Sequence, residues 1–248
     1  MKRNPSPILI SIMCFALATS ASAGTDISDA ETDKALSLTP NLENGKRIYR
    51  TCALCHAPEG WGSDSGRFPQ IAGQHASVVM KQLADIRADN RDNPTMLPFS
   101  QGRVLSGAQD IADVSAYIAQ LPMTPANGLG PGDRLERGEK LYAKNCVKCH
   151  GEDGEGDPEK FIPRIQGQHF AYMKRQMEWI KTGKRRNADD KMVKQLRGFS
   201  AEDIAAIADY ASRLKPAHES LAQPGWKNPD FEGEVLTAPE VQKAMPIE

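Results

Sequence analysis

The sequence predicts an all-α protein built from two tandem copies of one small domain. The segment from Cys52 to Ser106 matches the segment from Cys146 to Ser200 without a gap, at an offset of 94 residues. Repetition at a fixed offset indicates a duplicated structural unit. Each copy contains three stretches that favour helices, and no alternating apolar and polar pattern indicates a β-strand.

The repeat also sets the expected domain boundaries. Short motifs recur on both sides, and Gly73-Gln74-His75 is matched by Gly167-Gln168-His169. A stretch rich in proline and glycine separates the copies and indicates a linker. The expected organisation is a signal peptide (1–23), an acidic N-terminal arm without periodicity (24–40), a first domain (41–122), a linker (123–132), a second domain (133–216) and an extended acidic tail (217–248).

The three expected helices of each copy have local signals. The first contains a Gly-x-x-x-Tyr motif that begins at Gly45 or Gly138. The second covers residues 75–91, or 169–185 in the second copy. The third follows a capping serine, Ser106 or Ser200, and carries an apolar stripe with helical spacing.

A C-x-x-C-H motif follows the first helix segment of each copy, at residues 52–56 and 146–150. This spacing is the attachment signature of c-type haem. The two thiols lie on one helical face, where each can form a thioether to a haem vinyl group, and the histidine then faces the iron as its proximal ligand. The motifs therefore predict two covalently bound haem c groups, held by Cys52 and Cys55 with His56, and by Cys146 and Cys149 with His150.

Other uses of the cysteines fit the spacing less well. A structural zinc site would need its C-x-x-C pairs much closer in sequence, and a thioredoxin-like dithiol would need a βαβ pattern nearby. Two disulfides remain an alternative, because a C-x-x-C pair can oxidise. Haem attachment is the favoured interpretation.

The N-terminus has the three parts of a secretory signal. Lys2 and Arg3 form the basic region, residues 8–18 form a short apolar core, and Ala21-Ser22-Ala23 is the expected cleavage site. Cleavage after Ala23 would remove Cys14 and leave 29 basic and 32 acidic residues, a formal charge of −3. We expect a periplasmic protein.

Between residues 42 and 214 the chain resembles the cytochrome c4 family of dihaem cytochromes. The resemblance rests on the two haem motifs, on a Pro-x-Ile-x-Gly-Gln segment with the helix that follows it, and on a methionine ahead of the third helix. It implies two class I cytochrome c domains related by pseudo-twofold symmetry, each wrapped around one haem. It also implies periplasmic transfer of single electrons toward a terminal oxidase of a respiratory chain, and no enzymatic activity.

The resemblance implies histidine/methionine ligation of both irons. Met192 lies eight residues before Ser200 and Met96 lies ten residues before Ser106, so the two positions differ in register by two residues. A bis-histidine alternative would use His75 and His169. Met80, Met173 and Met177 are expected to pack in the core, and Met123 in the linker is expected to have no role.

Pro69 and Pro163 each follow a proximal histidine by 13 residues. The resemblance implies that their carbonyl oxygens accept a hydrogen bond from the histidine, which fixes the ring and increases its basicity as a ligand. The alternative is an ordinary turn proline.

The partners implied are redox proteins, with a membrane-bound oxidase or a quinol–cytochrome c oxidoreductase as candidates. No nucleic acid, and no metal beyond the haem iron, is expected. A basic surface on the second domain would attract an acidic partner, and a solvated face is the alternative. Its residues surround Met192: Lys181, Lys184, Arg185, Arg186, Lys191, Lys194 and Arg197.

Two further function classes stay open. The long tail is consistent with a dihaem subunit of a periplasmic dehydrogenase that oxidises a sulfur compound or an alcohol. A dihaem peroxidase would need one haem with a displaceable ligand, and the shifted register of Met96 is the feature that suggests it.

Overall fold

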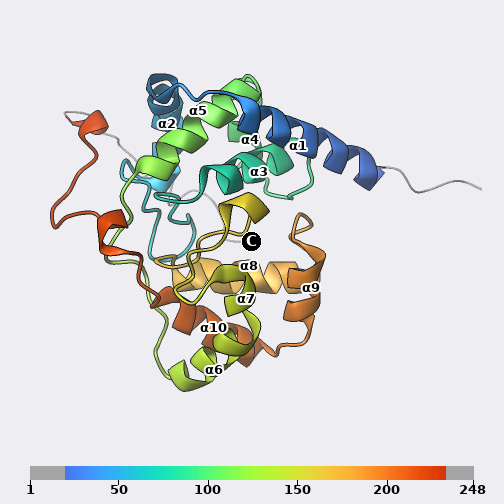
Figure 1. Ribbon diagram of the computed structural model, residues 1–248, viewed down its shortest axis with the longest axis vertical. Helices are drawn as coiled ribbons and strands as arrows, with labels where there is room; N and C mark the ends of the chain where they lie inside the picture. The colour runs from blue at the N-terminus through green and yellow to red at the C-terminus, as the bar shows by residue number, and fades with distance from the viewer. Residues whose placement is uncertain (1–19, 233–248) are drawn as a thin grey trace, which may run out of the picture.

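The computed structural model describes residues 20–232, and it confirms the all-α prediction within that range. The helices gather into two halves, with α2, α3 and α5 in the upper half of Figure 1 and α6, α8 and α10 in the lower half. The named α-helices are α1 (Ser20–Ser37), α2 (Leu42–His56), α3 (Ala76–Arg87), α4 (Leu97–Ser100), α5 (Ala108–Gln120), α6 (Leu135–Asn145), α7 (Val147–His150), α8 (Phe170–Thr182), α9 (Asp190–Arg197) and α10 (Ala201–Ser212). Three short 3-10 turns complete the set, η1 (Pro158–Lys160), η2 (His218–Ser220) and η3 (Pro229–Phe231).

The Gly-x-x-x-Tyr motif explains how the first and last helices of each half cross. A Cβ atom on Gly45 would lie 2.2 Å from the carbonyl oxygen of Asp113, and one on Gly138 would lie 2.2 Å from that of Ala206. Only glycine therefore allows α2 to approach α5, and α6 to approach α10, this closely. The tyrosine of each motif packs in the resulting core and is 1% exposed or less.

The first helix is continuous in one half and broken in the other. The helix α2 runs through the haem motif to His56, whereas α6 ends at Asn145 and the separate helix α7 begins at Val147. The second copy has one more residue between its tyrosine and its first cysteine. That insertion disturbs the helical register at Cys146, where the chain restarts as a short helix.

The third helices begin differently. Ser200 forms the predicted capping box with Asp203 at the start of α10. In the first half the prediction is wrong, because Gly107 and not Ser106 precedes α5. Ser106 instead bonds through its backbone N–H and its hydroxyl to Asp110, at 2.7 and 2.6 Å. The second helices are shorter than predicted and end at Arg87 and Thr182.

The N-terminal segment is not an arm without periodicity. Most of it forms α1, which packs along α3 at the upper right of Figure 1. Its contact face consists of Ser28, Thr32 and Ala35, each at most 2% exposed. The hydroxyl of Ser28 donates to Asp85 at 2.5 Å. These small side chains have helical spacing but little apolar character, so a search for apolar periodicity overlooks them. Of the expected signal peptide (1–23), residues 1–19 lie outside the described residues.

The two halves meet through matched hydrogen bonds. Gln168 accepts from the backbone N–H of Gln70 at 3.0 Å and donates to its carbonyl oxygen at 2.8 Å. Gln74, at the equivalent position of the first copy, makes the same pair of bonds to the backbone of Arg164, at 3.0 and 2.9 Å. Because each bond has its counterpart at an offset of 94, the halves are related by a pseudo-twofold axis.

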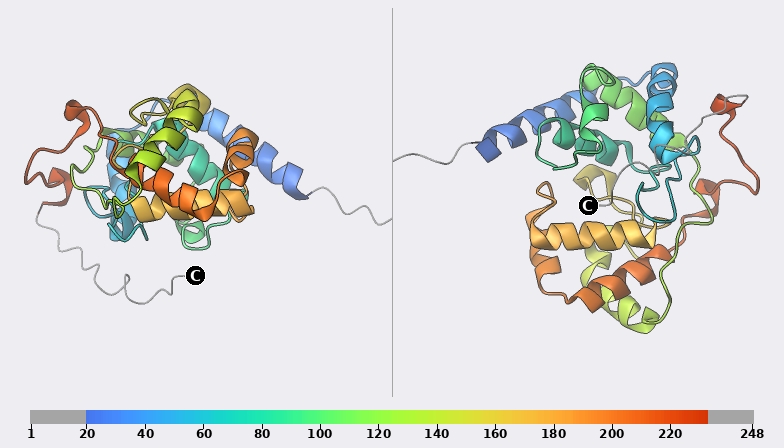
Figure 2. Two further views of the ribbon diagram at one scale, coloured as in Figure 1. Left: turned by 90° about the horizontal axis from the view of Figure 1, so that it is seen from below. Right: turned by 180° about the vertical axis from the view of Figure 1, so that it is seen from behind.

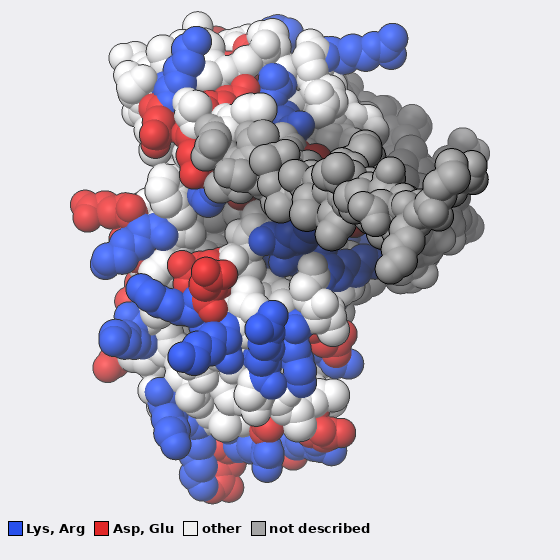
Figure 3. All heavy atoms as spheres, turned by 90° about the vertical axis from the view of Figure 1, so that its right-hand side faces the viewer, with Lys and Arg blue, Asp and Glu red and all other residues white. Residues whose placement is uncertain are grey.

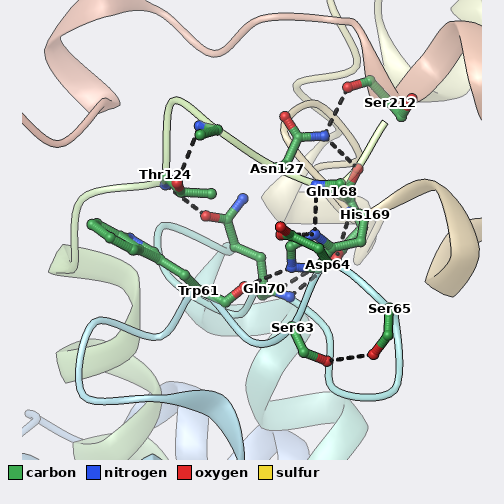
Figure 4. A network of polar contacts seen from close by, with 12 residues as sticks. Trp61, Ser63, Asp64, Ser65, Gln70, Thr124, Asn127, Gln168, His169 and Ser212 are labelled. Atoms are coloured by element: carbon green, nitrogen blue, oxygen red, sulfur yellow. Dashed lines mark hydrogen bonds and ion pairs between the residues drawn. The ribbon is translucent and has the colours of Figure 1, made fainter. Parts of the chain in front are cut away.

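The linker is part of this interface, as Figure 4 shows. The backbone N–H of Thr124 donates to the Gln70 side chain at 2.7 Å, and the Asn127 amide donates to the carbonyl oxygens of Gln168 and Ser212. Met123, for which no role was expected, is 3% exposed. The linker therefore fixes the relative position of the halves.

The tail turns back from the second half to the first. Residues 217–232, which we call the strap, run up the left side of Figure 1 and up the right side of the right-hand view of Figure 2. Phe231 packs against Tyr49 with ring centroids 6.0 Å apart, and Asp230 accepts a hydrogen bond from Tyr117 at 2.8 Å. Lys46 lies 2.6 Å from Asp230 and lowers the pKa of that carboxyl. Within residues 217–232 the tail is thus a strap, with the short turns η2 and η3, that packs on the first half.

Replacing Phe231 with alanine is expected to destabilise the first domain. The ring is 7% exposed, and its loss from a buried site costs about 3 kcal/mol, at the lower end of such changes, because the strap can detach rather than leave a cavity. Thermal unfolding should show the first domain melting earlier. Gln223→Ala changes an exposed side chain of the same strap and should leave the melting temperature unchanged. Equal melting temperatures for the two variants would contradict the role of the strap.

Candidate functional site

In the first half, the histidine of the haem motif is held by a single backbone contact. His56 ends α2, is 6% exposed, and places its Nδ1 atom 2.9 Å from the carbonyl oxygen of Pro69. A carbonyl oxygen only accepts, so Nδ1 carries the proton and Nε2 keeps the free electron pair that a metal requires. Burial lowers the pKa of His56, against a weaker opposing effect of Pro69, and favours this neutral form.

The second half repeats the arrangement. His150 ends α7, is 8% exposed, and has its Nδ1 atom 3.2 Å from the carbonyl oxygen of Pro163. Burial lowers the pKa of this histidine as well. Both prolines thus make the contact that the family resemblance implies, and both histidines present the nitrogen that would bind iron.

The loops after the histidines are fixed by the tyrosines of the Gly-x-x-x-Tyr motif. The hydroxyl of Tyr49 donates to the carbonyl oxygen of Ala57, and that of Tyr142 donates to Gly151, both at 2.8 Å. Each residue that follows the histidine has a positive φ, 66° at Ala57 and 82° at Gly151. The chain can therefore turn away directly after the histidine and return with the proline.

The four cysteines fit thioether attachment better than the alternatives. Cys52, Cys55, Cys146 and Cys149 are all free thiols. Burial raises the pKa of Cys52 to about 12 and that of Cys146 to about 11, whereas a redox-active dithiol needs a lowered pKa. Among residues 20–232, no three His, Cys, Asp or Glu side chains converge as a metal site. The two motifs thus do not combine into a zinc centre, and each thiol pair precedes an oriented histidine as haem attachment requires.

The two candidate methionine ligands lie in different local structures. Met96 comes directly before α4, and its backbone N–H is held by Asn93. Met192, which was expected in a loop, lies in the first turn of α9 because Asp189 caps that helix. Both side chains are half-buried. Met80 and Met173, by contrast, belong to the buried clusters of their halves, and Met177 packs against the second, as predicted.

The recurring histidines His75 and His169 serve the interface between the halves. Nε2 of His75 donates to the carbonyl oxygen of Glu155, and Nε2 of His169 donates to that of Trp61, both at 2.7 Å. Nδ1 of His169 also accepts from the backbone N–H of Gly128 at 2.9 Å. Both nitrogens of His169 are thus engaged, which disfavours the bis-histidine alternative (Figure 4).

Basic side chains gather on one face of the second half. Figure 3 shows them over the side on which α9 lies in Figure 1. Three of the predicted residues are engaged within the molecule, since Lys181 bonds to Phe199, Arg185 to Gln176 and Arg186 to Asp89. The remaining exposed set is Lys184, Lys191, Lys194 and Arg197. Lys148, which lies between the two cysteines, is also exposed and was overlooked in the sequence.

Comparison with known proteins gives consistent matches. The cytochrome c family model matches residues 42–122 and 135–215. Cytochrome c4 of Azotobacter vinelandii is 32% identical, over 68% of this chain and 87% of the relative. A thiosulfate dehydrogenase electron acceptor of Stutzerimonas stutzeri is 29% identical, over 72% of this chain and 90% of the relative. The crystal structure of reduced cytochrome c4 from Pseudomonas stutzeri superimposes with a TM-score of 0.60 at 27% identity, covering 71% of this chain and all of that one.

Proposed function

The chain belongs to the cytochrome c4 family of dihaem electron carriers, and on that basis we propose that it carries single electrons between redox proteins in the periplasm, toward a terminal oxidase. The family carries two covalently bound haem c groups. The orientation of His56 and His150, each by one proline carbonyl, is the observation that supports the proposal most directly.

The residues that would hold the cofactors follow from the motifs. Cys52 and Cys55 would form the thioethers of the first haem, and His56 and Met96 would be the protein ligands of its iron. The equivalent set in the second domain is Cys146, Cys149, His150 and Met192. Each bound haem supplies an iron that accepts and releases one electron. The protein fixes the histidine tautomer and buries both histidines.

The two domains together form a relay rather than a catalyst. With a histidine and a methionine on each iron, no coordination position is left for a substrate, so we propose no enzymatic activity. The interdomain hydrogen bonds of Gln168 and Gln74 hold both cofactor sites in one fixed arrangement. A redox titration followed by visible and near-infrared spectra tests this directly, since it counts the haems and identifies methionine ligation.

The second domain is the proposed docking site for an acidic partner. Lys191, Lys194 and Arg197 are exposed on α9, the helix that also carries Met192. Charges of one sign around a redox site raise the rate of encounter with an oppositely charged partner, and salt screens the effect. Within residues 20–232, no helix combines the length and apolar character needed to cross a membrane.

Reversing two of these charges should slow reaction with an anionic electron donor. For Lys191→Glu combined with Lys194→Glu, we expect the second-order rate of reduction by hexacyanoferrate(II) at low salt to fall by about tenfold. The difference should shrink as ionic strength rises. Stopped-flow kinetics measures both effects. Lys227→Glu on the strap is compared with the single variant Lys191→Glu, because both change the total charge by the same amount. Rates that do not respond to salt would refute steering by this face.

A second candidate function is a dihaem acceptor for a dehydrogenase of sulfur compounds. The similarity to the thiosulfate dehydrogenase electron acceptor supports it, and so does the strap, which lies beyond the two segments matched by the family model. Co-purification with a dehydrogenase, and reduction of both haems on addition of thiosulfate to the complex, would favour this candidate over an oxidase-linked carrier.

A further inference from the structure

Two arginines and two glutamines, one of each from either domain, form a closed cluster between the domains. Arg91 and Arg185 occupy equivalent positions of the repeat, and so do Gln82 and Gln176. The oxygen of Gln82 accepts from Arg91 at 2.7 Å and from Arg185 at 3.1 Å. The oxygen of Gln176 accepts from Arg185 at 3.1 Å and from Arg91 at 3.2 Å. We call these four residues the arginine–glutamine square.

The square contains more donors than its oxygens can accept. The Gln82 oxygen has two lone pairs, yet it also receives a third hydrogen bond, from Asn187 at 3.1 Å. The remaining acceptors are neutral, since Arg91 donates to the hydroxyl of Tyr172 at 3.3 Å and Arg185 to the Asn187 oxygen at 3.1 Å. Within the part of the chain that the structure describes, neither guanidinium forms an ion pair with a carboxylate. Two like charges therefore share neutral partners.

The acidic group that acts electrostatically on Arg185 is Asp85, and it is already engaged. Asp85 accepts from Asn187 at 2.7 Å and from Ser28 at 2.5 Å, and it pairs with Lys81 at 3.2 Å. The positive charge of the two arginines shifts the pKa values of neighbouring groups. Burial lowers the pKa of Arg185 to about 9, and Arg91 acts in the same direction. Burial would raise the pKa of Tyr172, but Arg91 and Arg185, together with Arg175, outweigh it and the pKa is lowered.

We propose that the arginine–glutamine square is a binding site for oxyanions, which takes a carboxylate or an inorganic oxyanion between the two domains. The planar fork of a guanidinium matches the two oxygens of such a group, and a charged acceptor gives a stronger bond than an amide oxygen. The anion could come from two sources. One source is haem itself, through the carboxylate of its propionate group. The other source is free sulfate or phosphate.

This site would link the two redox centres. Arg91 and Arg185 precede the candidate ligands Met96 and Met192 on the same chain segments, and each guanidinium bonds to glutamines of both domains. A change of charge at either arginine should therefore alter the reduction potentials of both haems. The inference uses the presence of two haems but is independent of the electron donor and acceptor.

The test is a redox titration of the dihaem protein and of the variants Arg91→Gln and Arg185→Gln, in chloride and in sulfate at equal ionic strength. Arg186→Gln is the matched control, because it removes the same charge from the neighbouring, exposed position. Arg91→Lys and Arg185→Lys keep the charge without the planar fork, and they replace the glutamine variants should those fail to fold. Melting temperatures are recorded alongside the potentials.

If the anion is a haem carboxylate, Arg91→Gln and Arg185→Gln each lower the reduction potentials of both haems, and they do so equally in chloride and in sulfate. We expect about a tenfold change in the ratio of reduced to oxidised haem, or about 59 mV for a one-electron couple. If the anion is free, the potentials of the parent depend on sulfate, and both lysine and glutamine variants lose that dependence. Variants that shift only the melting temperature, or that match Arg186→Gln in both buffers, would overturn the proposal.

Discussion

A variant with serine in place of both Cys146 and Cys149 is expected to carry one covalent haem where the parent carries two. A hydroxyl does not form the thioether, so nothing would hold the second haem once the protein is denatured. Mass spectrometry under denaturing conditions should show the loss of one haem mass, and the visible absorbance per chain should fall by about half, since the two c-type sites are alike.

The same variant should lose stability in its second domain. The buried apolar cluster of that domain consists of Tyr142, Met173, Ile207, Ala208 and Ala211. Such a small core depends on the apolar surface of the macrocycle. Thermal unfolding is therefore expected to separate into two steps, with the second domain melting first. Lys148→Ser, between the two cysteines, is the control and should keep both haems. Retention of two covalent haems by the double variant would refute the assignment of the motif.

Replacing Met192 with alanine is expected to produce the second large effect. In the ligation that we propose, the thioether sulfur of Met192 favours reduced iron, so its loss should lower the reduction potential of one haem. The near-infrared band of sulfur–iron ligation should drop to half its intensity. The opened position should also bind carbon monoxide, and we expect no such binding by the parent.

Two comparisons make the assignment specific. Met173→Ala removes a methionine that is 7% exposed in the core of the same domain, and it should reduce stability while keeping the full near-infrared band. Met96→Ala should repeat the effect of Met192→Ala on the other haem. If the band is unchanged in Met96→Ala, another side chain binds the first iron, and the peroxidase alternative gains support.

The features that repeat could be predicted from the sequence. Duplication made each motif visible twice, so the haem motifs, the Gly-x-x-x-Tyr segments and the proline positions were recognised, and the prolines do contact His56 and His150. The arginine–glutamine square also repeats at the same offset. It was overlooked because polar residues in a helix and in the loop after it give no periodic signal.

The features found in one copy alone could not be predicted. Met192 lies in a helix and Met96 before one, because Asp189 and Asn93 hold their backbones in different ways. The helix α1 depends on Ser28 meeting Asp85, 57 residues away. Contacts of this kind depend on tertiary packing and leave no local pattern.

The return of the strap to the first domain has a consequence for biogenesis. A chain is synthesised from its N-terminus, and domains made first generally fold first. Here Tyr49 and Tyr117 obtain their last neighbours from Phe231 and Asp230, which are made after both haem motifs. The first domain therefore obtains its full set of contacts only after the second has been produced.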